Sequence, residues 1–252
     1  MDSARNDASN DTGAMEAGFA PQPFPGWPFP HRPFPPDPQP TPAPPAFQAA
    51  HYTARLESIQ ILNTRSRHED SDKASVTVAV NNNQPVTVTK DLGDLNNGTY
   101  QVGLQVPNVS ITAPTDKFAF NYLVVNSGHA DWEKTNATLH QIGGQLASAG
   151  AKAATTAAGT LIGASIGGLV MPVIGSILGA AAGWLVDQVT SLLTANCDGP
   201  VALEQVGLTG EQLWLNTLHG AFRHTTYHPG IDSNAGCGSN SIYLATWSIS
   251  RS

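Results

Sequence analysis

Charged residues are scarce in this sequence. Lys, Arg, Asp and Glu make up 12% of its 252 residues, against about 25% in an ordinary soluble domain. The 12 basic residues form no stripe and are outnumbered by 19 acidic ones, which gives a net charge of -7. A nucleic-acid partner is therefore excluded, because phosphate backbones are held by clustered Lys and Arg. A surface this poor in charge is typical of an extracellular or oligomeric protein.

The local motifs of common enzyme families are also missing. The chain has no Gly-x-Ser-x-Gly nucleophile elbow, no phosphate-binding loop and no Gly-x-Gly-x-x-Gly after a strand. A catalytic triad does not need local motifs, so the alternative class is a hydrolase that uses His129 and Asp131. The sequence favours a protein that is not an enzyme.

Cysteine is nearly absent as well. Cys197 and Cys237 are the only two, and both lie in glycine-containing turn sequences of the C-terminal quarter. The sequence leaves two alternatives open, a disulfide that contributes roughly 4 kcal/mol in the loop-entropy model and two free thiols. Residues 1–18 lack the basic and apolar regions of a secretory signal peptide. We therefore expect either export by another route or a cytoplasmic protein.

Proline is concentrated at the N-terminus. Residues 1–50 contain 13 of the 19 prolines, and over residues 21–45 these alternate with Phe and Trp. Because proline lacks an amide donor and favours the polyproline II conformation, we expect residues 1–50 to form a disordered tail with exposed rings. This tail is either a stiff spacer or a docking peptide for the aromatic-lined groove of a protein partner.

The next part of the chain alternates apolar and polar residues, which is the pattern of half-buried strands. Turn sequences separate the strands, and residues 52–62 form a further candidate. Several short strands at this spacing predict an antiparallel β-sandwich, which we place in a domain over residues 51–252. The alternating apolar residues are Val76, Val78 and Val80; Val86 and Val88; Tyr100, Val102, Leu104 and Val106; and Phe118, Phe120, Tyr122 and Val124.

Helical spacing begins after residue 128. Leu139, Ile142 and Leu146 share one face of a helix predicted over 132–154, and Asp131 is its candidate cap. With the uncharged residues that follow, we expect a helical insertion at about 131–195. Strands return over 201–206, 212–218 and 241–250. The predicted fold class is therefore α+β, a β-sandwich with an inserted Gly/Ala-rich helical hairpin.

No charged residue occurs between positions 153 and 186, and glycine recurs there at every fourth position. Residues four apart share a helix face, so each half of the run presents a flat stripe against which another helix packs closely. Pro172 separates the halves, and each is about 20 Å long as a helix, shorter than the roughly 30 Å hydrocarbon core of a membrane. The glycines are Gly159, Gly163, Gly167, Gly175, Gly179 and Gly183.

This segment resembles the glycine-zipper class of membrane and pore-associated proteins, over about 35 of the 252 residues. Our hypothesis is a membrane-interacting or self-associating protein, of toxin or pore-forming type, in which lipid or a second copy covers the apolar side chains of the run. The alternative is a soluble binding or structural module with the glycine-rich helices as core and the proline-aromatic tail as docking peptide. The apolar side chains are Leu161, Ile166, Val170, Ile174 and Leu178.

Residues 65–73 contain six charged side chains, and we expect them to form a loop at one end of the sandwich. Asp70 and Asp72, joined by Asp91 or Asp94 from a neighbouring loop, are candidate oxygen ligands for Ca²⁺. A solvated, internally paired turn is the alternative. His129 and Asp131 are further metal candidates, for zinc if the loops that carry histidines converge.

Overall fold

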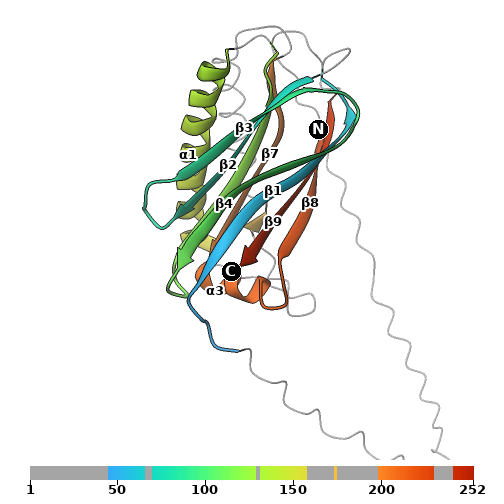
Figure 1. The fold of residues 1–252 in the computed structure, drawn as a ribbon. Helices are drawn as coiled ribbons and strands as arrows, with labels where there is room; N and C mark the ends of the chain where they lie inside the picture. Colours follow the sequence, from blue (N-terminus) through green and yellow to red (C-terminus); the bar gives the residue numbers. More distant parts are fainter. Residues whose placement is uncertain (1–44, 66–69, 129–130, 158–172, 175–197, 230–240) are drawn as a thin grey trace, which may run out of the picture. The chain divides into compact units, whose positions relative to one another are not determined.

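The computed structural model describes residues 45–65, 70–128, 131–157, 173–174, 198–229 and 241–252, and for 152–157 and 173–174 it describes the backbone alone. Most of the described residues lie in antiparallel strands, which form two sheets (Figure 1). Nearly all of the predicted proline-rich tail, residues 1–44, lies outside the described residues.

Sheet A has the strand order β4-β1-β9-β8. β1 pairs with β4 on one side and with β9 on the other, so the first and last strands of the described chain are neighbours. This closing pair means that residues far apart in sequence must meet before the sheet can form. The four strands are β1 (Ala50–Asn63), β4 (Gly98–Ile111), β8 (Phe222–Pro229) and β9 (Ile242–Arg251).

Sheet B has the order β3-β2-β5-β7-β6, and its neighbouring strands are all antiparallel. Its central strands, β2 and β5, consist almost entirely of buried residues. Its last strand is only two residues long. The strands are β2 (Asp70–Val80), β3 (Val86–Leu95), β5 (Lys117–Asn126), β6 (Val173–Ile174) and β7 (Gly199–Thr209).

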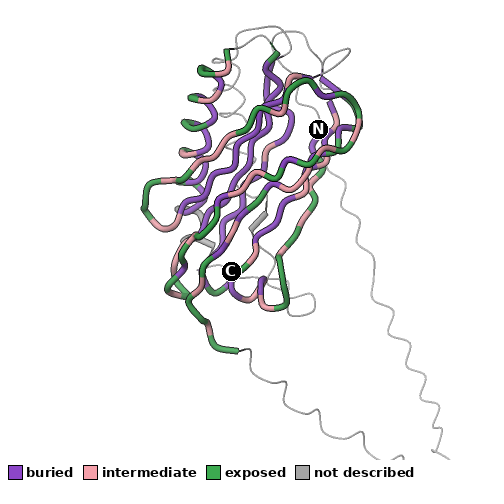
Figure 2. The backbone as a smooth tube through the Cα atoms, in the orientation of Figure 1, coloured by how far each residue is buried: buried purple, intermediate pink, exposed green. Residues whose placement is uncertain are grey.

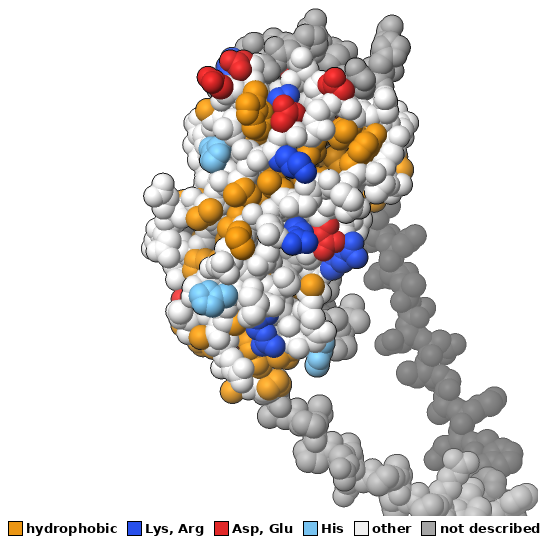
Figure 3. All heavy atoms as spheres, viewed as in Figure 1, with side chains coloured by type: hydrophobic (Ala, Val, Ile, Leu, Met, Phe, Trp, Pro, Cys, Tyr) orange, Lys and Arg blue, Asp and Glu red, His pale blue; other side chains and the backbone are white. Residues whose placement is uncertain are grey.

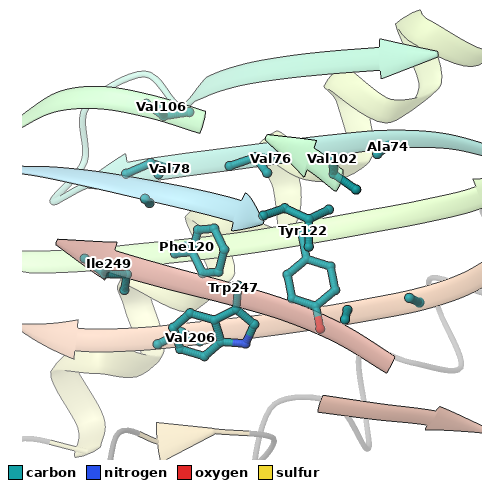
Figure 4. Packing of buried hydrophobic residues seen from close by; sticks show 14 of the residues in the cluster. Ala74, Val76, Val78, Val102, Val106, Phe120, Tyr122, Val206, Trp247 and Ile249 are labelled. Atoms are coloured by element: carbon teal, nitrogen blue, oxygen red, sulfur yellow. The ribbon is translucent and has the colours of Figure 1, made fainter. Parts of the chain in front are cut away.

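The inner faces of the two sheets share one apolar core, which gives the sandwich-like arrangement that the sequence predicted. Figure 4 shows the rings of Phe120 and Tyr122 from sheet B close to Trp247 from sheet A. The Phe120 and Trp247 ring centroids are 5.3 Å apart. In β4, Val102 and Val106 are buried in this core, as the alternating pattern predicted.

Helix α1 (Trp132–Ala157) covers the outer face of sheet B. Its buried residues Leu139, Ile142 and Leu146 pack against Leu123 and Val125 of β5, so the helix face predicted from the sequence is confirmed. Sheet B is therefore buried on both faces, and its central strands are purple along most of their length in Figure 2. This double burial explains why β5 reads as a nearly continuous apolar run.

Two elements after β7 differ from the sequence prediction. We expected a strand over 212–218, but helix α3 (Gly210–Asn216) begins there. Its start is fixed by a capping box, in which the Thr209 side chain accepts from the Gln212 amide and the Gln212 side chain accepts from the Thr209 amide. Strand β8 was not predicted, because its inward positions after Phe222 are polar: His224, Thr226 and His228.

The predicted helical insertion is described only in part. α1 confirms its first helix, whereas Val173 and Ile174 form strand β6 rather than the start of a second helix. These residues pair with Gly207 and Val206 of β7. Pro172 prevents a helix from continuing into this pair, and β-branched residues suit a sheet edge. The rest of the predicted hairpin lies outside the described residues.

Two adjacent glycines of α1 give a direct test of this packing. A Cβ on Gly143 collides with Thr77 Oγ1 of β2, whereas a Cβ on Gly144 meets only the Pro85 Cγ, at 4.0 Å. We expect Gly143→Ala to lower the free energy of unfolding by about 1–3 kcal/mol. Gly144→Ala should raise it by roughly 0.5–1 kcal/mol, because alanine favours the helix. Urea unfolding of both variants measures the difference, and equal effects would contradict the packing of α1 on β2.

Candidate functional site

The two edge strands β3 and β4 border an apolar cleft of about 300 Å³. The cleft opens between sheet A and sheet B, and Figure 3 shows hydrophobic side chains at the surface on the side where β3 and β4 lie. Its volume is at the lower limit of the range for small-molecule sites. Its walls are formed by Val78, Val80, Val86, Val88, Val106 and Val109.

The course of β3 and β4 explains why the cleft lies where it does. The strands follow each other through a short connection, yet they belong to different sheets. Near that connection the Lys90 ammonium of β3 donates to the Val102 carbonyl of β4 at 2.7 Å. At the far end, the register of β4 against β1 shifts between Val106 and Val109. The bulge contains Asn108, which has a φ of 58°, and such bulges bend a strand.

The mouth of the cleft is polar but uncharged. Asn83 and Gln84 come from the β2–β3 turn and Asn108 from the bulge of β4, and all three are exposed. The turn is fixed by Asn81, whose side chain donates to Asp116 at 3.0 Å and accepts from the Lys117 amide at 2.9 Å. The lining residues include no charged side chain and no histidine. The cleft therefore has the chemistry of a binding site for an apolar, neutral group.

Asp70 and Asp72, the candidate calcium ligands, are fully buried in β2. The loop expected over residues 65–73 is therefore wrong at its C-terminal end, where strand β2 begins at Asp70. Tyr243 of β9 donates to Asp70 at 2.7 Å and lies 2.8 Å from Asp72. Asn126 and the Arg65 amide also donate to Asp70. The pair therefore serves as an internal link between the two sheets.

One hydroxyl hydrogen on Tyr243 cannot satisfy two carboxylates at once. The geometry is satisfied when Asp72 carries a proton and donates to Tyr243, which then donates to Asp70. Burial raises the pKa of Asp72 well above its usual range, and the charge of Asp70 adds to this effect. The second oxygen of Asp72 has no hydrogen-bond partner in the part of the chain that the structure describes.

The other metal candidates do not join this pair. Asp94 lies on β3 and accepts from the Ser71 hydroxyl, and Asp91 accepts from the Gly93 amide on the same strand. Asp131 precedes α1 and accepts from the Glu133 amide at 3.1 Å, as expected of a cap. His129 lies outside the described residues. In the part of the chain that the structure describes, no three His, Cys, Asp or Glu side chains are grouped so that they could hold a metal ion.

A second buried polar network, which sequence reasoning missed, surrounds Glu204 of β7. One carboxylate oxygen accepts from Trp247 at 2.7 Å, from Tyr122 at 3.0 Å and from the Thr226 hydroxyl. His228 Nε2 lies 2.7 Å from the Tyr122 hydroxyl. Because Tyr122 donates to Glu204, His228 is the donor in that contact, which requires the Nε2–H tautomer. An acidic residue within the mostly apolar strand β7 is the sequence signal that could have indicated this network.

Burial lowers the pKa of His228 to about 4, since the charged form is poorly solvated there. His224 and His228 have the spacing of four residues that places two zinc ligands on one face of a helix. They lie on strand β8, where His224 packs on Trp247 with ring centroids 5.8 Å apart. The two histidines therefore serve the core and the Glu204 network, and they do not form a helical ligand pair.

The remaining predicted sites fall mostly outside the described residues. This holds for all six spaced glycines, for Leu161, Ile166, Val170 and Leu178, and for Cys197 and Cys237. Only Ile174 is described, in strand β6. Among the described helices, none combines the length and apolar character that a membrane span requires.

No protein-family model matches the sequence, and no curated protein is significantly similar to it.

The Glu204 network predicts a pH dependence of stability. Because the pKa of His228 is lowered from 6.5 to about 4 in the folded protein, the unfolded chain binds a proton first as the pH falls. The contribution of His228 to the free energy of unfolding is complete above pH about 6.5. It falls by roughly 3 kcal/mol between pH about 6.5 and 4. Urea unfolding across this pH range measures the effect. His228→Gln should remove this loss of stability at low pH, whereas His219→Gln, at an exposed position, should keep it. An unchanged pH profile in His228→Gln would exclude this role.

Proposed function

We propose that this chain is a non-enzymatic binding protein whose β-sandwich holds an apolar group of its ligand in the β3/β4 cleft. The observation that carries the proposal is the combination of valine walls with a mouth of exposed amides. Apolar concave sites with a few polar groups at the entrance are the usual form of a ligand pocket.

The buried polar groups favour this reading over catalysis. The buried acids are hydrogen-bonded inside the sandwich, Asp70 to Tyr243 and Glu204 to Tyr122. None of these buried polar groups lines the cleft, and neither does Asp72. Hydrogen bonds from Tyr243 to Asp70 and from Trp247 to Glu204 join sheet A to sheet B, which supports a fixed separation of the two walls of the cleft. The sandwich thus acts as a rigid frame around a preformed opening.

A matched pair of tryptophan substitutions tests the site. Val86 lines the cleft and is 54% exposed, whereas Leu62 is 46% exposed and lies away from it. The probe is octan-1-ol, a small neutral apolar alcohol, and calorimetric titration measures its binding. We expect it to bind the wild-type protein, to bind Val86→Trp at least tenfold more weakly, and to bind Leu62→Trp with unchanged affinity. If the probe does not bind, or if Val86→Trp binds it as well as the wild type does, the cleft is not the binding site.

A second candidate function is membrane interaction or self-association through the uncharged residues 153–186. Two observations support it. The run has no charged side chain to form a solvated helix face, and its flanking elements α1 and β7 both belong to the layers around sheet B. The run therefore leaves and returns to the same body. Membrane insertion in this proposal requires release of β6 from β7.

Substitution of a spaced glycine separates this candidate from a purely structural role. Gly167→Leu should abolish flotation with phosphatidylcholine–phosphatidylglycerol vesicles and leave the unfolding midpoint unchanged. Ser165→Leu, between the spaced glycines, is the control and should float like the wild type. If the wild type does not float, and Gly167→Leu lowers the stability as much as Leu146→Ala in the α1 core does, the run is part of the core.

A further inference from the structure

We propose that the β3/β4 cleft selects an unbranched saturated chain that ends in an uncharged polar head, such as a hydroxyl or an amide. This inference rests on the proposed binding function and adds the chemical class of the ligand. Three properties of the cleft support it: the residue types of its walls, its size and the lack of charge at its mouth.

The walls favour an aliphatic ligand. Six valines supply the apolar lining, and no aromatic side chain is among the lining residues. Ligands with rings usually gain part of their affinity from stacking or edge contacts with aromatic side chains. The lining of this cleft contains no aromatic side chain for such contacts. A saturated chain gains its affinity from burial alone, at about 0.8 kcal/mol for each methylene group.

The size favours an unbranched ligand. The cleft follows β4 from Val106 to Ser110, a length of about 13 Å at the rise of a strand. Across it, the width is set by two sheets that pack roughly 10 Å apart before their side chains fill the space. With a volume of about 300 Å³, the cleft is at the lower limit for small-molecule sites, which favours a short unbranched chain over a bulky ligand.

The mouth favours a neutral head. Asn83 and Gln84 offer amide donors and acceptors at the end formed by the β2–β3 turn. The nearby carboxylate of Asp116 already accepts from Asn81 at 3.0 Å, from the Thr112 amide at 2.8 Å and from the Ala113 amide at 3.0 Å. The Lys90 ammonium donates to the Val102 carbonyl, and neither residue lines the cleft. A charged head would lose part of its hydration against the amides without gaining an opposite charge.

Calorimetric titration of the full chain at pH 7.5 tests the selection. The probes are octan-1-ol, octanoate, octylammonium and 2-phenylethanol, which differ in head charge or in the presence of a ring. We expect octan-1-ol to bind at least tenfold more tightly than the other three. Equal binding of octanoate would overturn the neutral-head inference, and tighter binding of 2-phenylethanol would overturn the aliphatic one. Either result leaves the binding function in place, because that function fails when the wild type binds no probe or when Val86→Trp binds as well as the wild type.

A charge placed at the mouth provides the second test. Asn83 lines the cleft, whereas its neighbour Asn82 is exposed and does not. Asn83→Lys should bring octanoate to at least the affinity of octan-1-ol, because the new ammonium pairs with the carboxylate head. Asn82→Lys should keep the preference of the wild type. If the two variants behave alike, the head does not lie at the turn and the proposed orientation is wrong.

Discussion

Sheet B has sheet A against one face and α1 against the other, and this double burial constrains the rest of the structure. Its polar residues must bond inside the protein, because unpaired polar groups are costly in an apolar interior. On the outer face Asn121 and Gln205 donate to backbone carbonyls of α1, those of Gly143 and Leu146. On the inner face Glu204 bonds across to sheet A. The same strands thus join all three layers.

Among the described residues, tyrosine and tryptophan side chains link the two sheets. Tyr243 and Trp247 of β9 reach carboxyl groups of sheet B, while Tyr122 of sheet B reaches His228 of β8. These side chains fill the core with their rings and satisfy buried acids with their polar ends. Such contacts have fixed geometry, so they hold the sheets in one relative position and allow the β3/β4 edge to remain open.

The open edge is also protected against pairing with other chains. β4 contains Pro107 and two residues with positive φ, Gly103 and Asn108, and β3 contains Lys90 and Asp91. Such residues disfavour the addition of a further strand. What the edge offers is therefore an opening between the sheets, bordered by valines, and this is the reason for placing ligand recognition between the layers.

Periodicity was sufficient to predict the strands with apolar alternation, the face of α1 and the sandwich-like arrangement, because these depend on local spacing of apolar residues. Periodicity failed where pairing with a neighbouring strand decides the secondary structure. β8 has polar residues at most positions and becomes a strand through its pairing with β9, and Val173–Ile174 becomes a strand through β7. The capping box of α3 was visible in the sequence but was not recognised.

The sequence by itself therefore determined the layers and the apolar faces of this protein. Tertiary structure alone decided where the charges and openings lie. Asp70 and Asp72 read as a solvated turn or a calcium loop, yet pairing of β2 between β3 and β5 carries them into the interior beside Tyr243. The valines of the cleft read as ordinary core positions, and they border an opening because β3 and β4 join different sheets. The spacing of apolar residues indicates which side of a strand is apolar, but it does not indicate what packs against that side.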